Sequence, residues 1–91
     1  MNFPPGKLRM LNQPRPIRVQ PDTQGRPVAV RVRGVAHRVA RIADQWRIDE
    51  GWWRHPPEPI SRMYYALELD DGRTITVFQD LVSGHWYEQR A

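Results

Sequence analysis

A β-hairpin signal in residues 61–80, SRMYYALELDDGRTITVFQD, constrains the fold of this 91-residue chain more than any other feature. Two runs rich in aromatic and β-branched residues flank an acidic turn that ends in Gly72. A two-residue turn would mix the faces of the two strands, whereas a three-residue turn over 70–72 keeps them separate, and matching faces decide the register. We therefore predict that Tyr64 lies opposite Phe78 and that Gly72 adopts a left-handed backbone conformation.

Residues 26–41, RPVAVRVRGVAHRVAR, predict a second hairpin with a two-residue turn at Arg33-Gly34. This register places Val30 opposite His37. It puts the valines at 28, 30, 32 and 39 on one face and the arginines at 31 and 38 on the other.

The alternation fails beyond Val39, because Ile42 and Trp46 fall out of phase with it. A β-bulge near Ala40–Arg41 would restore the phase. A helix over 35–46 fits the spacing of the apolar residues nearly as well, so both structures remain open for this segment.

The remaining segments complete a small β domain. A short edge strand is expected at residues 17–19 and a last strand at 85–90, while prolines at 56, 57 and 59 make residues 46–59 a connecting loop. We expect an all-β fold of about six antiparallel strands, as a strongly bent sheet or partly open barrel, over residues 15–91. Residues 1–14, rich in proline, are expected to form an irregular N-terminal arm.

Aromatic side chains must form much of the core, since a chain of this length without cysteine has no disulfides to stabilise it. The aromatic residues expected in the core are Trp46, Trp86, Tyr65 and Phe78. Neighbours on an extended strand point to opposite faces, so one member of each adjacent aromatic pair is expected outside. The aromatic residues expected to be partly exposed, and available to a protein partner, are Trp52, Trp53 and Tyr64.

Residues that could perform catalysis or bind a metal are sparse. The three histidines, His37, His55 and His85, do not share ligand spacing on one element, and no cysteine accompanies them. Asp70 and Asp71 stand beside a glycine between two strands, where acids usually form turns. No phosphate-binding or nucleophile motif is present. We expect no catalytic residue, no metal site, no cofactor and no enzymatic activity.

Membrane association is not expected either. No apolar run approaches the roughly 20 residues of a membrane-spanning helix. The N-terminus MNFPPGKLRM has no signal-peptide pattern, so a cytoplasmic location is expected.

The charge of the chain is strongly asymmetric. Residues 1–47 carry a balance of +8 and residues 48–91 a balance of −4. A basic half is typical of proteins that bind nucleic acid, although the two halves could also complement each other within one fold. The arginines expected to contact phosphates are Arg31, Arg33 and Arg38, with Arg41 and Arg18 at the margin.

Three segments of the chain resemble a known family: VRVRGVAHRV, IADQWRIDEGWW and SRMYYALELDDGRTITVFQDLVSGHWYEQR. They resemble a bacterial family of domains of about ninety residues and unknown function. This module is similar to the C-terminal region of the inactive Y-family DNA polymerase homologue of the bacterial mutasome. The resemblance implies a role in DNA repair or translesion synthesis and assigns no active residue.

Two functions are therefore expected. The first is an accessory module that binds single- or double-stranded DNA through the arginine-rich hairpin. The second is a protein-interaction module that docks on a repair polymerase or accessory protein through its tryptophan loop and proline-rich arm.

Overall fold

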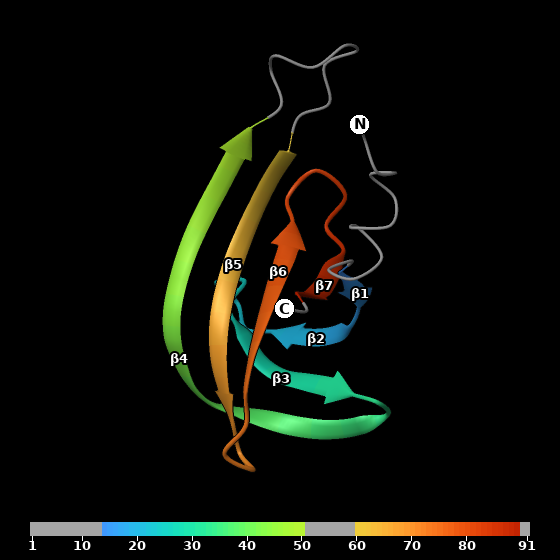
Figure 1. Cartoon of the computed structure of the whole chain (residues 1–91), viewed down its shortest axis with the longest axis vertical. Coiled ribbons are helices and arrows are strands. Elements are labelled where there is room, and N and C mark those ends of the chain that lie inside the picture. Colours follow the sequence, from blue (N-terminus) through green and yellow to red (C-terminus); the bar gives the residue numbers. More distant parts are fainter. Residues whose placement is uncertain (1–13, 51–59, 90–91) are drawn as a thin grey trace, which may run out of the picture.

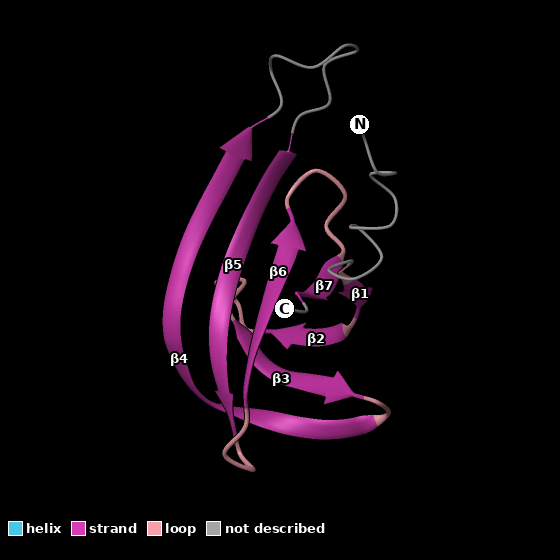
Figure 2. Cartoon of the chain, viewed as in Figure 1, coloured by secondary structure: helices cyan, strands magenta, loops and turns pink. Residues whose placement is uncertain are grey.

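The computed structural model describes residues 14–50 and 60–89. All regular elements in these ranges are antiparallel strands, drawn as arrows in Figures 1 and 2. The strands are β1 (Arg15–Pro16), β2 (Arg18–Pro21), β3 (Pro27–Val32), β4 (Val35–Glu50), β5 (Ile60–Leu69), β6 (Thr74–Asp80) and β7 (Trp86–Gln89). None of the described residues lies in a helix long and apolar enough to cross a membrane.

The seven strands form one sheet in the order β1-β7-β6-β5-β4-β3-β2, which curls strongly upon itself (Figure 1). β1 and β2 are consecutive parts of one segment, yet β1 pairs with β7 and β2 pairs with β3 at opposite ends of this order. Between them, the N–H of Ile17 donates to the carbonyl of Trp86 at 3.2 Å. The expected all-β, partly open barrel is confirmed, with seven strands because the first segment divides between two neighbours.

The hairpin of β5 and β6 has the predicted register. Tyr64 lies opposite Phe78. Gly72 has a φ of 88°, and its N–H donates to the carbonyl of Leu69 at 3.0 Å across the three-residue turn. The left-handed glycine closes the turn without the steric cost that a side chain would carry there.

The hairpin of β3 and β4 is also confirmed. Val30 lies opposite His37 and Val32 opposite Val35. The two turn residues, Arg33 and Gly34, both have positive φ, 50° and 80° respectively, as a two-residue hairpin turn of this type requires.

β4 is a strand of 16 residues, so the strand interpretation of residues 35–46 is correct and the helix is not. The register shifts between Val39 and Arg41, as the predicted bulge requires, and again between Ile42 and Asp44. The predicted start of the following loop at residue 46 is wrong, because β4 pairs with β5 through Glu50. The rest of that loop, residues 51–59, lies outside the described residues, as do residues 1–13 of the predicted arm.

Val28 departs from the predicted face. The register between β2 and β3 shifts beside Pro21, where Ala29 and then Pro27 are paired, so Val28 is the extra residue of a bulge. Val28 is consequently 41% exposed, and Pro27 takes the buried position.

The core lies on the inner face of the curled sheet. Its buried members are Val30, Val32, Tyr65, Leu67, Leu69 and Val77. Trp86, which was expected in the core, is half-buried and packs against this cluster, with its ring centroid 5.7 Å from that of Tyr65.

A row of four aromatic rings crosses the opposite, outer face. Trp46, Tyr64, Phe78 and Tyr87 lie directly opposite one another on β4, β5, β6 and β7. Their centroids are 4.9 to 5.4 Å apart. We call these four residues the aromatic ladder.

The aromatic ladder overturns two predictions. Tyr64 is only 8% exposed rather than available to a partner, because its ring stands between Trp46 and Phe78. Trp46 is 38% exposed rather than part of the core, because it stands at the end of the row on the outer face.

Candidate nucleic-acid interface

Two arginines face each other across the ladder of β2 and β3. Arg18 lies directly opposite Arg31, and both are exposed. Their neighbours Val19 and Val30 are also paired and belong to the core side, so strand alternation turns both arginines to the outer face. Like charges directly opposite in an antiparallel pair are destabilising. The fold therefore maintains a local concentration of positive charge here.

Arg33 adds a further charge at the turn that follows β3. Its left-handed backbone, with φ of 50°, is one that residues other than glycine and asparagine adopt at a cost of about 1–2 kcal/mol. The guanidinium of Arg31 donates to the carbonyl of Gly34 at 2.9 Å and so braces the same turn. This hydrogen bond ties the side chain of Arg31, at the end of β3, to the turn that contains Arg33.

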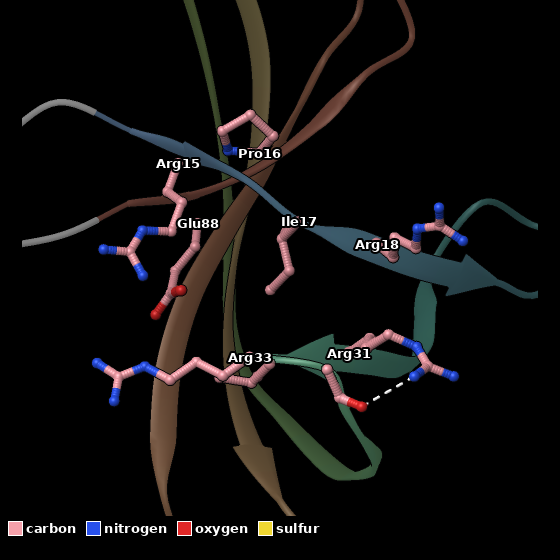
Figure 3. Close-up of a pocket in the computed structure, with 9 residues that line it drawn as sticks. Arg15, Pro16, Ile17, Arg18, Arg31, Arg33 and Glu88 are labelled. Carbon is pink, nitrogen blue, oxygen red and sulfur yellow. Dashed lines mark hydrogen bonds between the residues drawn. The ribbon is translucent and has the colours of Figure 1, made fainter.

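A hollow of about 280 Å³ opens between this turn and the segment that holds β1 and β2 (Figure 3). Arg15 and Arg33 extend to one side of the hollow, together with Glu88, while Arg18 and Arg31 extend to the other. Sequence reasoning missed Arg15, since a two-residue strand next to a proline gives no alternation to read.

Arg38 extends the basic surface along β4. Ala36 lies opposite Arg31, and Arg38 lies two positions beyond Ala36 on the same face. Arg38 and Arg31 are therefore diagonal neighbours on the outer face. Such neighbours in antiparallel strands are about 7–8 Å apart, within reach of long side chains. We call Arg15, Arg18, Arg31, Arg33 and Arg38 the arginine surface.

Two acids lie at the arginine surface without forming an ion pair with it: Glu88 lies directly opposite Arg15, and the carboxylate of Asp70 accepts the backbone N–H of Arg38. Among the described residues, none of its five members forms an ion pair with a carboxylate, and Glu88 is the one acid that lines the hollow. Arg41, which was also predicted as a contact, differs because its guanidinium lies 3.6 Å from the carboxylate of Glu68. The structure thus brings together four of the five predicted arginines and pairs the fifth.

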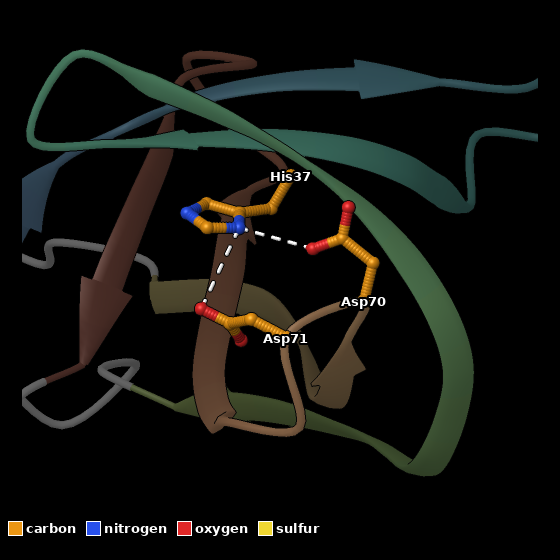
Figure 4. A group of neighbouring side chains, drawn as sticks. All are labelled: His37, Asp70 and Asp71. Atoms are coloured by element: carbon orange, nitrogen blue, oxygen red, sulfur yellow. Dashed lines mark hydrogen bonds and ion pairs between the residues drawn. The ribbon is translucent and has the colours of Figure 1, made fainter.

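A second polar cluster joins the two hairpins beside this surface (Figure 4). Nδ1 of His37 lies 3.0 Å from Asp70, and Nε2 of His37 lies 3.1 Å from the guanidinium of Arg73. The tautomer protonated at Nδ1 satisfies both contacts, since it donates to Asp70 and accepts from Arg73. Arg73 also donates to Asp71 at 2.9 Å. We call these four residues the histidine clamp.

Hydrogen bonds to the two carboxylates of the histidine clamp favour their ionised forms. The pKa of Asp70 is lowered, chiefly by the backbone N–H of Arg38 at 3.1 Å and then by His37. The pKa of Asp71 is lowered, chiefly by the backbone N–H of Arg73 at 3.0 Å. The carboxylate of Asp70 therefore ties the first residues of strand β4 to the turn of the other hairpin.

Metal binding would compete with this network. His37, Asp70 and Asp71 offer ligand atoms within 4.8 Å of one another. Those atoms already accept or donate hydrogen bonds within the clamp, and the guanidinium of Arg73 would repel a cation. The arrangement therefore suits a structural bridge between the two hairpins. Asp70 and Asp71 also lie in the turn, as predicted.

Three aromatic residues were predicted to bind a protein partner. Trp52 and Trp53 lie outside the described residues, and Tyr64 is covered by its neighbours in the aromatic ladder. Comparison of the chain with protein-family models, with curated proteins and with solved structures finds no match.

Proposed function

We propose that this protein is a non-enzymatic module that binds the phosphate backbone of DNA through the arginine surface. The observation that carries the proposal is the direct opposition of Arg18 and Arg31 without a carboxylate paired to either among the described residues. A phosphate placed between two guanidinium groups would relieve their repulsion, and release of its counterions would drive binding.

The turn at Arg33 supports the same function. Asparagine or glycine would fit the left-handed position better than arginine, so the residue there is not the one that best stabilises the hairpin. Strained residues that persist in a fold often serve binding, and a guanidinium at the rim of an arginine-lined hollow is suited to a phosphate oxygen.

The expected binding is weak and tolerant of sequence. Contacts to phosphate carry no information on base identity, and non-specific affinities at physiological salt are on the order of 10⁻⁴ to 10⁻⁶ M. The resemblance to a module of the bacterial mutasome suggests a DNA-repair assembly as the setting, in which a partner protein would supply the remaining affinity.

The proposal is tested with a pair of variants that lose equal charge. Arg31→Gln/Arg33→Gln removes two arginines that form no ion pair with a described carboxylate, whereas Arg26→Gln/Arg47→Gln removes two that are paired with Asp22 and Asp49. Fluorescence anisotropy with labelled DNA at low salt should show strong weakening for the first variant and little change for the second. Equal weakening would show that only net charge matters, and failure of the unsubstituted chain to bind would favour the protein-interaction function instead.

A further inference from the structure

The aromatic ladder ends in Trp46, and no described strand covers the outer side of its ring. Trp46 is stacked on Tyr64 with an interplanar angle of 5° and a centroid distance of 5.4 Å. Tyr64 and Phe78 are 8% and 2% exposed, whereas Trp46 is 38% exposed. One face of the indole is therefore fixed against the protein while a large part of the residue remains in water.

The open side of Trp46 coincides with an unpaired edge of the sheet. β3 pairs with β4 only as far as Arg38. Among the described residues, β4 pairs with β5 alone from residue 44 to residue 50. β4 accordingly forms the outer margin of the sheet along its second half in Figure 1. No described strand lies beside the indole on the side away from Tyr64.

Trp46 shares its face of the sheet with three members of the arginine surface, Arg18, Arg31 and Arg38. Arg41 lies opposite Glu68 and Trp46 lies opposite Tyr64, and both partners alternate on β5 with core residues, as Arg31 does on β3. Trp46 lies eight positions beyond Arg38, a distance of at most about 26 Å along an extended strand. A chain of a few nucleotides could therefore contact both.

An acidic side chain lies along this path. Asp44 is outward-facing, opposite Ala66, and its carboxylate accepts the N–H of Gln45 at 2.8 Å. The one arginine between Arg38 and Trp46, Arg41, is paired with Glu68. The described stretch of β4 between the arginine surface and Trp46 therefore carries an acid, Asp44, and no arginine without an ion pair. Phosphate contacts are accordingly expected at the arginine surface and a base contact at Trp46.

We infer that the nucleic acid held by the arginine surface is single-stranded and that one of its bases stacks on the open face of Trp46. The inference rests on the proposed function and adds the class of ligand. Bases in a duplex are covered by their neighbours, whereas bases of a single strand can stack on an aromatic side chain irrespective of sequence. The stacking of Trp46 on Tyr64 holds the indole ready for such a contact.

Three DNA probes of about 12 nucleotides test the inference, a length within the span covered by small single-strand-binding domains. They are a single strand, the matching duplex, and a strand whose central nucleotides are abasic. The single strand should bind more tightly than the abasic strand, by roughly 5- to 150-fold, the range expected for stacking of one base on an aromatic ring. It should also bind more tightly than the duplex.

Substitutions of Trp46 assign this preference to the indole. Trp46→Leu, which keeps an apolar side chain but removes the ring, should bring the ratio of the two single-stranded probes close to one. Trp46→Phe should retain a substantial part of the preference. Ile48→Ala, at the next outward-facing position of the same strand, should leave the ratio unchanged. Circular dichroism confirms that each variant is folded.

The outcomes separate this inference from the proposed function. Equal binding of all three probes, abolished by Arg31→Gln/Arg33→Gln, would overturn the single-strand inference and leave phosphate binding intact. A preference for bases that survives Trp46→Leu in the folded protein would also overturn it. Absence of binding to every probe would overturn the proposed function itself.

Discussion

Arg18 and Arg31 lie directly opposite each other across the β2–β3 ladder, with no ion-paired carboxylate at either within the described part of the chain. Cross-strand pairs of like charge reduce sheet stability, and those of opposite charge increase it by roughly 0.2–1 kcal/mol. Arg18→Glu is therefore expected to raise the free energy of unfolding by an amount in this range while weakening DNA binding. Urea denaturation and anisotropy on the same preparation measure both effects. Loss of stability in Arg18→Glu would mean that the two arginines do not repel each other.

Substitution of Arg33 is likewise expected to change protein stability and DNA affinity in opposite directions. Arg33→Asn should stabilise the protein by about 1 kcal/mol, because asparagine tolerates positive φ and Asn-Gly is a preferred hairpin turn. The same variant should bind DNA more weakly, since it loses a guanidinium at the hollow. A variant that is no more stable than the original chain would argue against strain at this position.

Gly72 provides a separate test of the other hairpin. Its φ is 88°, and a Cβ added there would meet no atom within 4 Å. Gly72→Ala should therefore destabilise the fold by about 1 kcal/mol through backbone conformation alone, without a steric clash. Thermal denaturation measures the change. A cost several times larger would indicate that the turn packs against a neighbour.

Much of the β-sheet was predictable because its determinants are local. The turn residues at 33–34 and 70–72, together with alternation in the flanking strands, specify both hairpin registers. The bulge at Ala40 was also readable, since the apolar phase changes there. These features depend on residues a few positions apart.

The outer face was not predictable, because its contacts join residues distant in the sequence. Alternation indicates that Tyr64 and Tyr65 point to opposite faces, but it does not reveal that Trp46 and Phe78 cover Tyr64. The contact of His37 with Asp70 likewise spans 33 positions. Four of the five predicted arginines lie near one another. The fifth, Arg41, is paired with Glu68, and that pairing depends on the register that the two bulges of β4 set against β5.

The aromatic ladder predicts unequal costs for truncating its members. Phe78 is 2% exposed, so Phe78→Ala should cost about 3–5 kcal/mol, enough to unfold so small a domain. Trp46→Ala should cost distinctly less, because more than a third of the residue is already in water. Urea denaturation of both variants gives the comparison. Equal losses would place Trp46 in the core, contrary to the structure.

Acid should weaken the fold partly through Asp70. Hydrogen bonds from Arg38 and His37 lower its folded-state pKa below the ordinary value of 3.8. Its contribution to stability is therefore complete above pH 3.8 and is lost as the pH falls through the lower folded-state pKa. Asp70→Asn should be less stable than the original chain at pH 7, with the difference shrinking below pH 4. Denaturation curves across this range test it, and a difference that grows in acid would contradict the assignment.

The salt dependence of DNA binding tests the central claim most directly. For a single strand, the slope of log K against log salt concentration changes by about 0.7 for each phosphate contact. Arg31→Gln/Arg33→Gln should therefore reduce the magnitude of the slope by about 1.4, whereas Arg26→Gln/Arg47→Gln should leave it nearly unchanged. Anisotropy titrations at several salt concentrations provide the slopes. The same slope for both variants, or affinity of the unsubstituted chain that does not fall with salt, would contradict phosphate binding by the arginine surface.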